Sequence, residues 1–195
     1  VGSGITVNPG ASDILLEGNS ISQILLPGGG NASPLSYGIL VWGNTDPINP
    51  PTGIDIADNH ISNVLGSAIS LGSNTANFSI EGNVFENIIP VLFQDNPLAI
   101  GVQAELCDGL LIQNNQYNDL LVGNSLVNCS SVGVGAAGEL GNDYINTSLQ
   151  LLTTWPHNIN ILDEPWWSTT LSTDGVSMSE AFFGTPTDPT YLYFA

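Results

Sequence analysis

Residues 78–88 read FSIEGNVFENI, and this segment decides the fold because the chain repeats its pattern three more times. Residues 14–24 (ILLEGNSISQI), 54–64 (IDIADNHISNV) and 110–120 (LLIQNNQYNDL) align with it without gaps. The first, third, eighth and eleventh positions of every copy are apolar. The sixth position is always asparagine, in the series Asn19, Asn59, Asn83 and Asn115. A repeat of this kind predicts a stack of similar structural units.

The spacing within each copy predicts strands rather than a helix. Apolar residues at positions one and three have the period of two that buries one face of a strand. Two small or polar residues and the asparagine then interrupt the alternation, which predicts a bend. The apolar residue at position eight begins a second short strand. Helical spacing would not place an asparagine beside an alternating apolar pair in every copy.

A weaker pattern between the copies predicts a third strand in each coil. Residues 38–44, 68–74 and 99–103 carry alternating aliphatic pairs, which are Ile39/Val41, Ile69/Leu71 and Ile100/Val102. The first positions of successive copies are 40, 24 and 32 residues apart. The spacing of 24 fits one coil with short turns. The spacing of 40 fits either two coils or one coil with a long loop, which Pro47, Pro50 and Pro51 would mark.

These features predict an all-β chain in which residues 1–140 form a right-handed parallel β-helix, a solenoid of stacked coils. Stacked coils lie about 4.8 Å apart, the spacing of hydrogen-bonded strands. Asparagines at the same bend of successive coils would then form a ladder, with each side-chain amide bonded to its neighbours. We therefore expect the four asparagines to be structural rather than catalytic.

Two of the copies carry a family resemblance. Residues 56–63 (IADNHISN) and 80–87 (IEGNVFEN) resemble the repeats of the pectate-lyase-like superfamily, and the resemblance covers residues 5–140. It implies architecture alone, because that superfamily includes lyases, hydrolases, epimerases, phage tailspikes and adhesins. Its lyases abstract a proton with lysine or arginine, and its polygalacturonase-like hydrolases combine aspartates and a histidine with a basic pair. The chain contains no lysine or arginine, so neither catalytic motif is matched.

Residues 141–195 contain no copy of the repeat and are rich in Thr, Pro and Trp. Solenoid ends need a cover that stops their strand edges from pairing onward, so we expect an irregular C-terminal cap or arm. The apolar close, residues 191–195, is suited to a docking strand. Candidates for an interface or for stacking on a sugar are Trp166, Trp167, Tyr191, Tyr193 and Phe194. We expect removal of residues 185–195 to weaken assembly more than it unfolds the solenoid.

The charge balance excludes several functions. The chain has 18 acidic residues, two histidines and no basic residue, although charged residues make up only 9% of it. Nucleic-acid binding needs lysine or arginine to displace counterions from phosphates. Anionic surfaces would be repelled unless a cation bridged them, and no apolar run is long enough for a membrane helix. Acidic surroundings, trypsin-like proteases or a surface without amines would favour such a composition, and a base-free stretch of a larger protein is the alternative.

Few residues of the chain are typical of a catalytic or metal-binding site. The closest approach to a catalytic set is formed by Asp55, Asp58, His60 and Glu81, because paired carboxylates can act on a glycosidic bond. The two aspartates occupy outward positions of the repeat, however, where solvated residues are expected anyway. Calcium would suit Asp and Asn oxygens, but the chain has no tight Asp-x-Asp-x-Asp-Gly loop. We therefore predict no cofactor and no metal centre, with calcium as the alternative that the sequence leaves open.

Two further sets of residues could be modified covalently. Cys107 and Cys129 are 22 residues apart, close to one coil, so they could stack within disulfide reach, and two buried free thiols are the alternative. Asparagines in Asn-x-Ser/Thr sequons could carry glycans if the source glycosylates exported proteins. These sequons begin at Asn31, Asn77, Asn128 and Asn146.

Two functions remain open. The first is a non-enzymatic structural or interaction protein, exported to the extracellular space or to a cell or virion surface. It would assemble with copies of itself into a fibre, sheath or adhesive layer, with neutral glycans as a further partner. The second is a polysaccharide-active enzyme or carbohydrate-binding β-helix that uses a groove of carboxylates.

Overall fold

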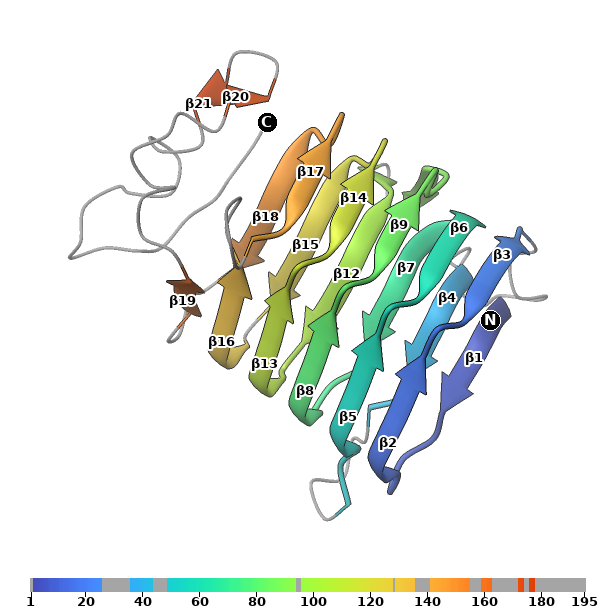
Figure 1. The fold of residues 1–195 in the computed structure, drawn as a ribbon, viewed down its shortest axis with the longest axis vertical. Helices are drawn as coiled ribbons and strands as arrows, with labels where there is room; N and C mark the ends of the chain where they lie inside the picture. The colour runs from blue at the N-terminus through green and yellow to red at the C-terminus, as the bar shows by residue number, and fades with distance from the viewer. Residues whose placement is uncertain are drawn as a thin grey trace.

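The computed structural model is built almost entirely of parallel strands that wind into a β-helix (Figure 1). It describes residues 2–25, 36–43, 49–93, 96–127, 129–135, 141–154, 159–162, 172–173 and 176–177. Each of the first five coils contributes one strand to each of three parallel sheets, which we call sheets A, B and C, and the last described coil contributes a strand to sheets A and B. Strands distant in sequence therefore lie side by side along the stack, as Figure 1 shows for β2, β5, β8, β13 and β16.

The sheets contain six, six and five strands. Sheet A is β1 (Gly2–Val7), β4 (Ser36–Val41), β7 (Gly66–Leu71), β12 (Ile100–Glu105), β15 (Val122–Val127) and β18 (Leu149–Thr154). Sheet B is β2 (Ser12–Glu17), β5 (Thr52–Ala57), β8 (Ala76–Glu81), β13 (Asp108–Gln113), β16 (Ser130–Gly135) and β19 (Ile159–Leu162). Sheet C is β3 (Ser20–Ile24), β6 (His60–Val64), β9 (Val84–Glu86), β14 (Gln116–Asn118) and β17 (Asp143–Ile145).

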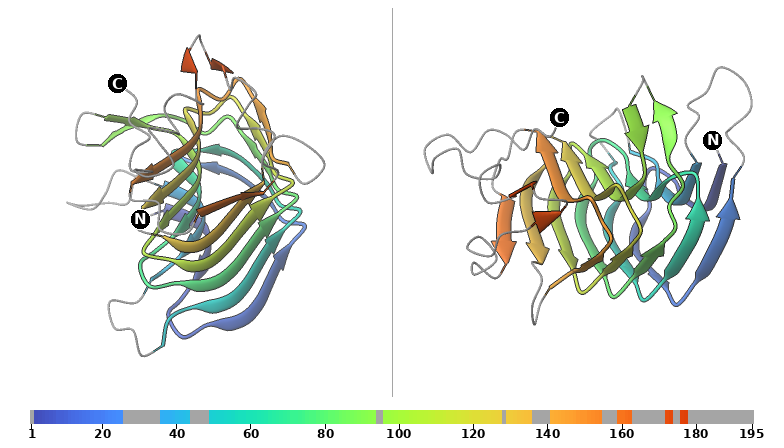
Figure 2. Two further views of the ribbon diagram at one scale, coloured as in Figure 1. Left: turned by 90° about the vertical axis from the view of Figure 1, so that its left-hand side faces the viewer. Right: turned by 90° about the horizontal axis from the view of Figure 1, so that it is seen from above.

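Two short antiparallel pairs lie outside these sheets. Strands β10 (Val91–Phe93) and β11 (Asn96–Leu98) form a hairpin that projects from the stack (Figure 2). Strands β20 (Ser172–Thr173) and β21 (Val176–Ser177) pair beyond the last coil. None of the described residues forms a helix that could cross a membrane.

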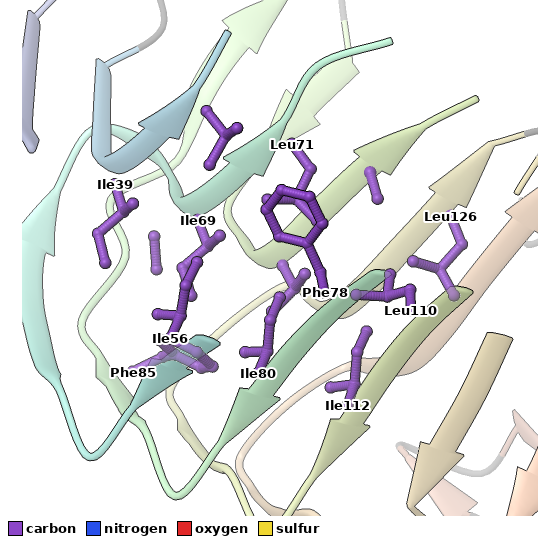
Figure 3. Close-up of a cluster of buried hydrophobic side chains, with 14 of the residues drawn as sticks. Ile39, Ile56, Ile69, Leu71, Phe78, Ile80, Phe85, Leu110, Ile112 and Leu126 are labelled. Carbon is purple, nitrogen blue, oxygen red and sulfur yellow. The ribbon is translucent and has the colours of Figure 1, made fainter. Parts of the chain in front are cut away.

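The repeated apolar positions form columns inside the solenoid, as predicted. Ile56 pairs with Ile80, and Ile80 with Ile112, so position three of each copy lies over the same position of the next (Figure 3). All three side chains are fully buried. The alternation of the repeat therefore builds a dry interior that runs along the stack.

A column of small residues in sheet A allows sheet C to pack closely against it. A Cβ atom at Gly38 would lie 2.4 Å from Cγ2 of Ile61, and one at Gly101 would lie 2.5 Å from Cε1 of Tyr117. Even the methyl group of an alanine at either position would therefore clash with the facing side chain unless the backbone shifted. Glycine here provides space for the large residues at position eight of the repeat.

The bends depend on left-handed backbone conformations at matching positions. The residue before each of the four repeat asparagines has positive φ, in the series Gly18, Asp58, Gly82 and Asn114. Glycine and Asx residues tolerate this conformation better than other residues. At Gly82 a Cβ would clash with Oδ1 of Asp58, whereas a Cβ at Gly18 would meet nothing within 4 Å.

Strand pairing establishes three details of the repeat. The spacing of 40 residues is a single coil, one of the two alternatives that the sequence left open, since Ile14 pairs directly with Ile54. In the third strand, Val102 rather than Ile100 pairs with Ile69. The sheets also continue past residue 140, because β17, β18 and β19 extend them to Leu162. The predicted C-terminal cap or arm lies mostly outside the described residues.

Candidate functional site

The asparagine ladder is the most regular polar feature of the described structure. The backbone N–H and Nδ2 of Asn19 both donate to Oδ1 of Asn59, each at 2.9 Å. Asn59 donates in the same way to Asn83 at 3.0 and 2.9 Å. Asn83 donates to Asn115 at 3.0 Å through both groups. The predicted ladder is therefore confirmed, and every rung points in the same direction.

A second set of hydrogen bonds ties each rung to the coil before it. Nδ2 of Asn59 donates to the main-chain oxygen of Leu16 at 2.8 Å. Nδ2 of Asn83 and of Asn115 make the matching bonds to the oxygens of Ile56 and Ile80, also at 2.8 Å. One side chain thus joins three coils, which explains why this bend carries asparagine rather than serine or aspartate.

The ladder has a fifth member that the sequence analysis missed. Asn115 donates through its N–H and Nδ2 to Oδ1 of Asn142 at 3.0 and 3.1 Å. Residues 136–140, which separate Asn142 from the preceding strand, broke the gapless alignment. One sequence feature could still have identified this member of the ladder. Each repeat asparagine is followed two residues later by a large apolar side chain, and Tyr144 follows Asn142 in the same way.

At the other end of the stack, the first coil leaves its interior incompletely covered. Ile54, Ile56 and Val64 in the second coil are fully buried. Their counterparts in the first coil, Ile14, Leu16 and Ile24, are only partly buried. Strands β1, β2 and β3 each have a neighbouring strand on one side only, within the part of the chain that is described. This end is called the head below.

The predicted catalytic residues do not converge. Asp55 lies on the outer face of sheet B, where it pairs with Ser79, whereas His60 lies across the bend in sheet C. His60 contacts Glu86 through Nε2 at 3.1 Å, and both side chains are 51% exposed. Such an exposed ion pair contributes about 0–1 kcal/mol to stability at most.

The other two carboxylates have structural neighbours. Glu81 accepts a hydrogen bond from Nδ2 of Asn114 at 3.0 Å. Asp58 is exposed at the bend, above Gly82. Among the described residues, no three Asp, Glu, His or Cys side chains are grouped so that they could hold a metal ion.

The two cysteines are stacked as predicted, but the structure contains them as free thiols rather than as a disulfide. Asp108 pairs with Ser130, so Cys107 and Cys129 precede matched positions of neighbouring coils, and both are buried. The hydrogen bond between them, together with burial, raises the pKa of Cys107 far above its usual range. The same hydrogen bond lowers the pKa of Cys129, so the pair shares one proton more readily than two separate thiols would release one.

A buried hydrogen-bonded network crosses the interior near the last coils. The hydroxyl of Tyr117 donates to Oδ1 of Asn124 at 2.7 Å, and Nδ2 of Asn124 donates to the hydroxyl of Tyr144 at 2.8 Å. The two tyrosine rings are stacked with centroids 4.7 Å apart. Burial raises the pKa of both hydroxyls well above the ordinary tyrosine value. This network could not be predicted from the sequence, because Asn124 occupies a position that is aliphatic in most other coils.

Two of the predicted glycosylation sites are described. Asn77 and Asn146 are exposed, although Asn77 Nδ2 contacts Thr52 Oγ1 at 3.4 Å and Asn146 Nδ2 donates to Asp119 at 3.1 Å. Asn31 and Asn128 lie outside the described residues. The predicted interface residues also lie outside them, namely Trp166, Trp167, Tyr191, Tyr193 and Phe194.

Comparison of the chain with protein-family models, with curated proteins and with solved structures gave no match. The functional argument therefore depends on the geometry of the described residues.

Proposed function

We propose that this chain is a non-enzymatic structural protein that assembles with copies of itself into an extracellular or surface fibre, sheath or adhesive layer. The observation that carries the proposal is the head. There, three parallel strand edges and the partly exposed interior residues Ile14, Leu16 and Ile24 meet at one end of the stack. Uncovered strand edges are ready templates for pairing with another chain.

The arrangement of the acidic residues supports this proposal over catalysis. A glycosidase of the common type needs two carboxylates on either side of one sugar bond. Asp55 and Asp58 are both solvated, and Glu81 accepts a hydrogen bond from Asn114. A relationship to the pectate-lyase-like superfamily is proposed for the architecture only.

Export is proposed from the composition. A chain without lysine or arginine has no cleavage site for trypsin-like proteases, which is an advantage for a material exposed outside the cell. Its formal net charge of −18 also opposes close contact between copies at neutral pH. We therefore expect assembly to depend strongly on pH and ionic strength.

Negative-stain electron microscopy and light scattering of the purified chain test the proposal. Filaments or sheets that form as the concentration rises, without sugar release from neutral or acidic polysaccharides, are the expected result. A dispersed monomer at every pH and salt concentration would contradict it. Sugar release by such a monomer would favour the alternative, a polysaccharide-active β-helix.

A further inference from the structure

The two buried cysteines belong to a column that crosses three successive coils. Thr75, Cys107 and Cys129 immediately precede β8, β13 and β16, which pair in register. The three residues therefore occupy the same corner of neighbouring coils, at the turn from sheet A to sheet B. Each is at most 2% exposed, and both cysteines belong to the apolar core. This corner thus holds two stacked thiols beside one hydroxyl, all shielded from water.

The hydroxyl of Thr75 has no partner among the described residues. Its Oγ1 is buried and makes no hydrogen bond with any described group. A buried hydroxyl without a partner costs free energy, so it calls for a ligand or a functional role. Hydrogen bonding to Cys129 and burial raise the pKa of Cys107, whereas Thr75 lowers it, which is the effect of a donor that favours the thiolate. Thr75 is therefore positioned to donate to the Cys107 sulfur once that sulfur is negatively charged.

The chain supplies no lysine or arginine that could neutralise thiolates at this corner. The charged side chains that act on the pair are acidic, namely Asp108 on Cys107 and Glu105 on Cys129, and both oppose ionisation. Buried charges need a partner of opposite sign, and a bound metal ion is one such partner. A cation between the two sulfur atoms would therefore stabilise them as thiolates, the form of cysteine that binds metals.

We propose that Cys107 and Cys129 bind one Cu(I) ion as a pair of thiolates, with the Thr75 hydroxyl as a hydrogen-bond donor to the Cys107 sulfur. Thiolates are soft ligands that select Cu(I), and this ion is stable with only two of them. Structural zinc takes four ligands and iron–sulfur clusters are held by four cysteines, whereas the chain has two cysteines. The described residues also offer no group of three Cys, His, Asp or Glu side chains.

Calcium, which the sequence left open, does not fit this corner because it takes oxygen ligands. The inference goes beyond the assembly proposed above and does not depend on it. The ion and the Cys107–Cys129 disulfide exclude each other, since both use the same two sulfur atoms. The oxidised chain is therefore expected to bind no Cu(I) at this corner.

Binding exchanges protons for the metal ion. Two thiols and one Cu(I) ion give a complex with two sulfur ligands and one negative charge, and two protons are released. No electron is transferred, because the ion is supplied as Cu(I). Cys129 and burial raise the pKa of Cys107 far above its usual range, so the free pair holds at least one proton at neutral pH. The affinity is therefore expected to fall about tenfold or more for each unit by which the pH is lowered from 8 to 6.

Competition with the Cu(I) chelator bicinchoninate, under argon, measures the affinity of the full chain. One ion per chain is expected, bound about a hundredfold more tightly than by Cys107→Ser or Cys129→Ser, since either substitution leaves a single thiolate. X-ray absorption of the loaded chain is expected to report two sulfur ligands. The ion is also expected to raise the melting temperature by several degrees, because the stacked pair exists only in the folded chain.

Thr75→Val tests the donor separately from the thiols. Valine is similar in size and removes a buried hydroxyl without a partner, so the metal-free chain is expected to be at least as stable. Loss of the donor is expected to weaken Cu(I) binding about tenfold. Thr147→Val is the matched control, because the Thr147 hydroxyl is also buried but donates to the oxygen of Tyr117, between sheets C and A. It is expected to lower the melting temperature and leave the affinity unchanged.

Several results would overturn the site. These are binding that survives either cysteine substitution, fewer than two sulfur ligands, or a melting temperature lowered by the ion, which would mean that the unfolded chain binds it better. An affinity unaffected by Thr75→Val would overturn the role of the hydroxyl. If a cysteine variant does not fold, the number of sulfur ligands in the native chain decides. None of these outcomes affects the proposed self-assembly.

Discussion

At the scale of single residues, asparagine is the side chain that holds neighbouring coils in register. Its amide donates in two directions and its oxygen accepts two hydrogen bonds, so Asn83 alone contacts Asn59, Asn115 and the oxygen of Ile56. All of these atoms lie in the buried part of the bend. Loss of one amide therefore leaves several buried polar groups without partners.

Asn83→Ala is accordingly expected to lower the free energy of unfolding by about 3–5 kcal/mol. Asn19→Ala removes the same group from the partly exposed end and is expected to cost about 1 kcal/mol. Urea denaturation followed by circular dichroism measures both. Equal losses at the two positions would mean that burial of the ladder does not determine its contribution.

The buried tyrosines predict an alkaline loss of stability. Burial raises the pKa of Tyr117 and Tyr144 in the folded chain, whereas an unfolded tyrosine titrates near pH 10. The protonated hydroxyls therefore favour the folded state fully below about pH 10, and this contribution is lost as the pH rises toward the folded pKa. Above pH 10 each tyrosine should lower the free energy of unfolding by about 1.4 kcal/mol per pH unit.

The chain is well suited to this measurement because it has no lysine, so tyrosines and cysteines dominate its alkaline titration. Tyr144→Phe is expected to reduce the slope of stability against pH between pH 10 and 11, measured by urea denaturation. A slope unchanged by the substitution would show that Tyr144 ionises equally well in the folded and unfolded chains.

At the scale of elements, the sequence specified two of the three strands in each coil better than the third. Sheets B and C carry the asparagine motif, whose apolar positions align without gaps between Ile14 and Leu120. Sheet A lacks such a marker, and its register depends on glycines that face the large residues of sheet C, such as Gly101 against Tyr117. A glycine does not reveal from sequence whether it marks a turn or a close approach, so the pairing of Val102 with Ile69 could not be predicted.

The candidate site was also predictable only where the sequence repeats a side chain at the same position of each coil. The ladder was predictable because hydrogen bonds between coils require the same residue at the same position. The polarity of the ladder and the open first coil were not, because both depend on how complete coils stack. Asn142 was missed because it lies farther from the end of β16 than the other repeat asparagines lie from the strands before them, so a gapless alignment does not include it.

The stacked thiols give a prediction for the elements that they join. Cys107 precedes β13 and Cys129 precedes β16, so a disulfide would link adjacent coils of sheet B. In a buffer containing oxidised glutathione, one thiolate of the pair would attack the reagent, form a mixed disulfide and release one reduced glutathione. The other thiol would then lose its proton and displace the second reduced glutathione as the Cys107–Cys129 disulfide forms. The resulting loop of 22 residues is expected to add about 3 kcal/mol to the free energy of unfolding.

Mass spectrometry would detect the loss of two hydrogens, and thermal unfolding with and without reductant would detect the added stability. A Cys107→Ala variant is the control and should gain nothing from the oxidised buffer. Persistence of both thiols under oxidising conditions in the native chain would show that the buried pair is not accessible to the reagent.

At the scale of the whole molecule, the stack and its charge act in opposite directions. The open head favours contact between copies, whereas a formal net charge of −18 opposes it at neutral pH. No lysine or arginine is present to offset this repulsion, so assembly must depend on protonation or screening of the carboxylates. The isoelectric point near 4.1 indicates the pH range in which the repulsion disappears.

We therefore expect the concentration needed for assembly to fall at least tenfold between pH 7.5 and pH 4.5, as static light scattering and sedimentation would measure. Half-molar sodium chloride at pH 7.5 should produce part of this effect, because it shortens the screening length to about 4 Å. Calcium at the same ionic strength should add little, since the described carboxylates form no group that could hold a metal ion. If calcium alone restored assembly at pH 7.5, carboxylates of two copies would have to share the ion. The contact would then be a bridged acidic surface rather than the neutral strand edge at the head.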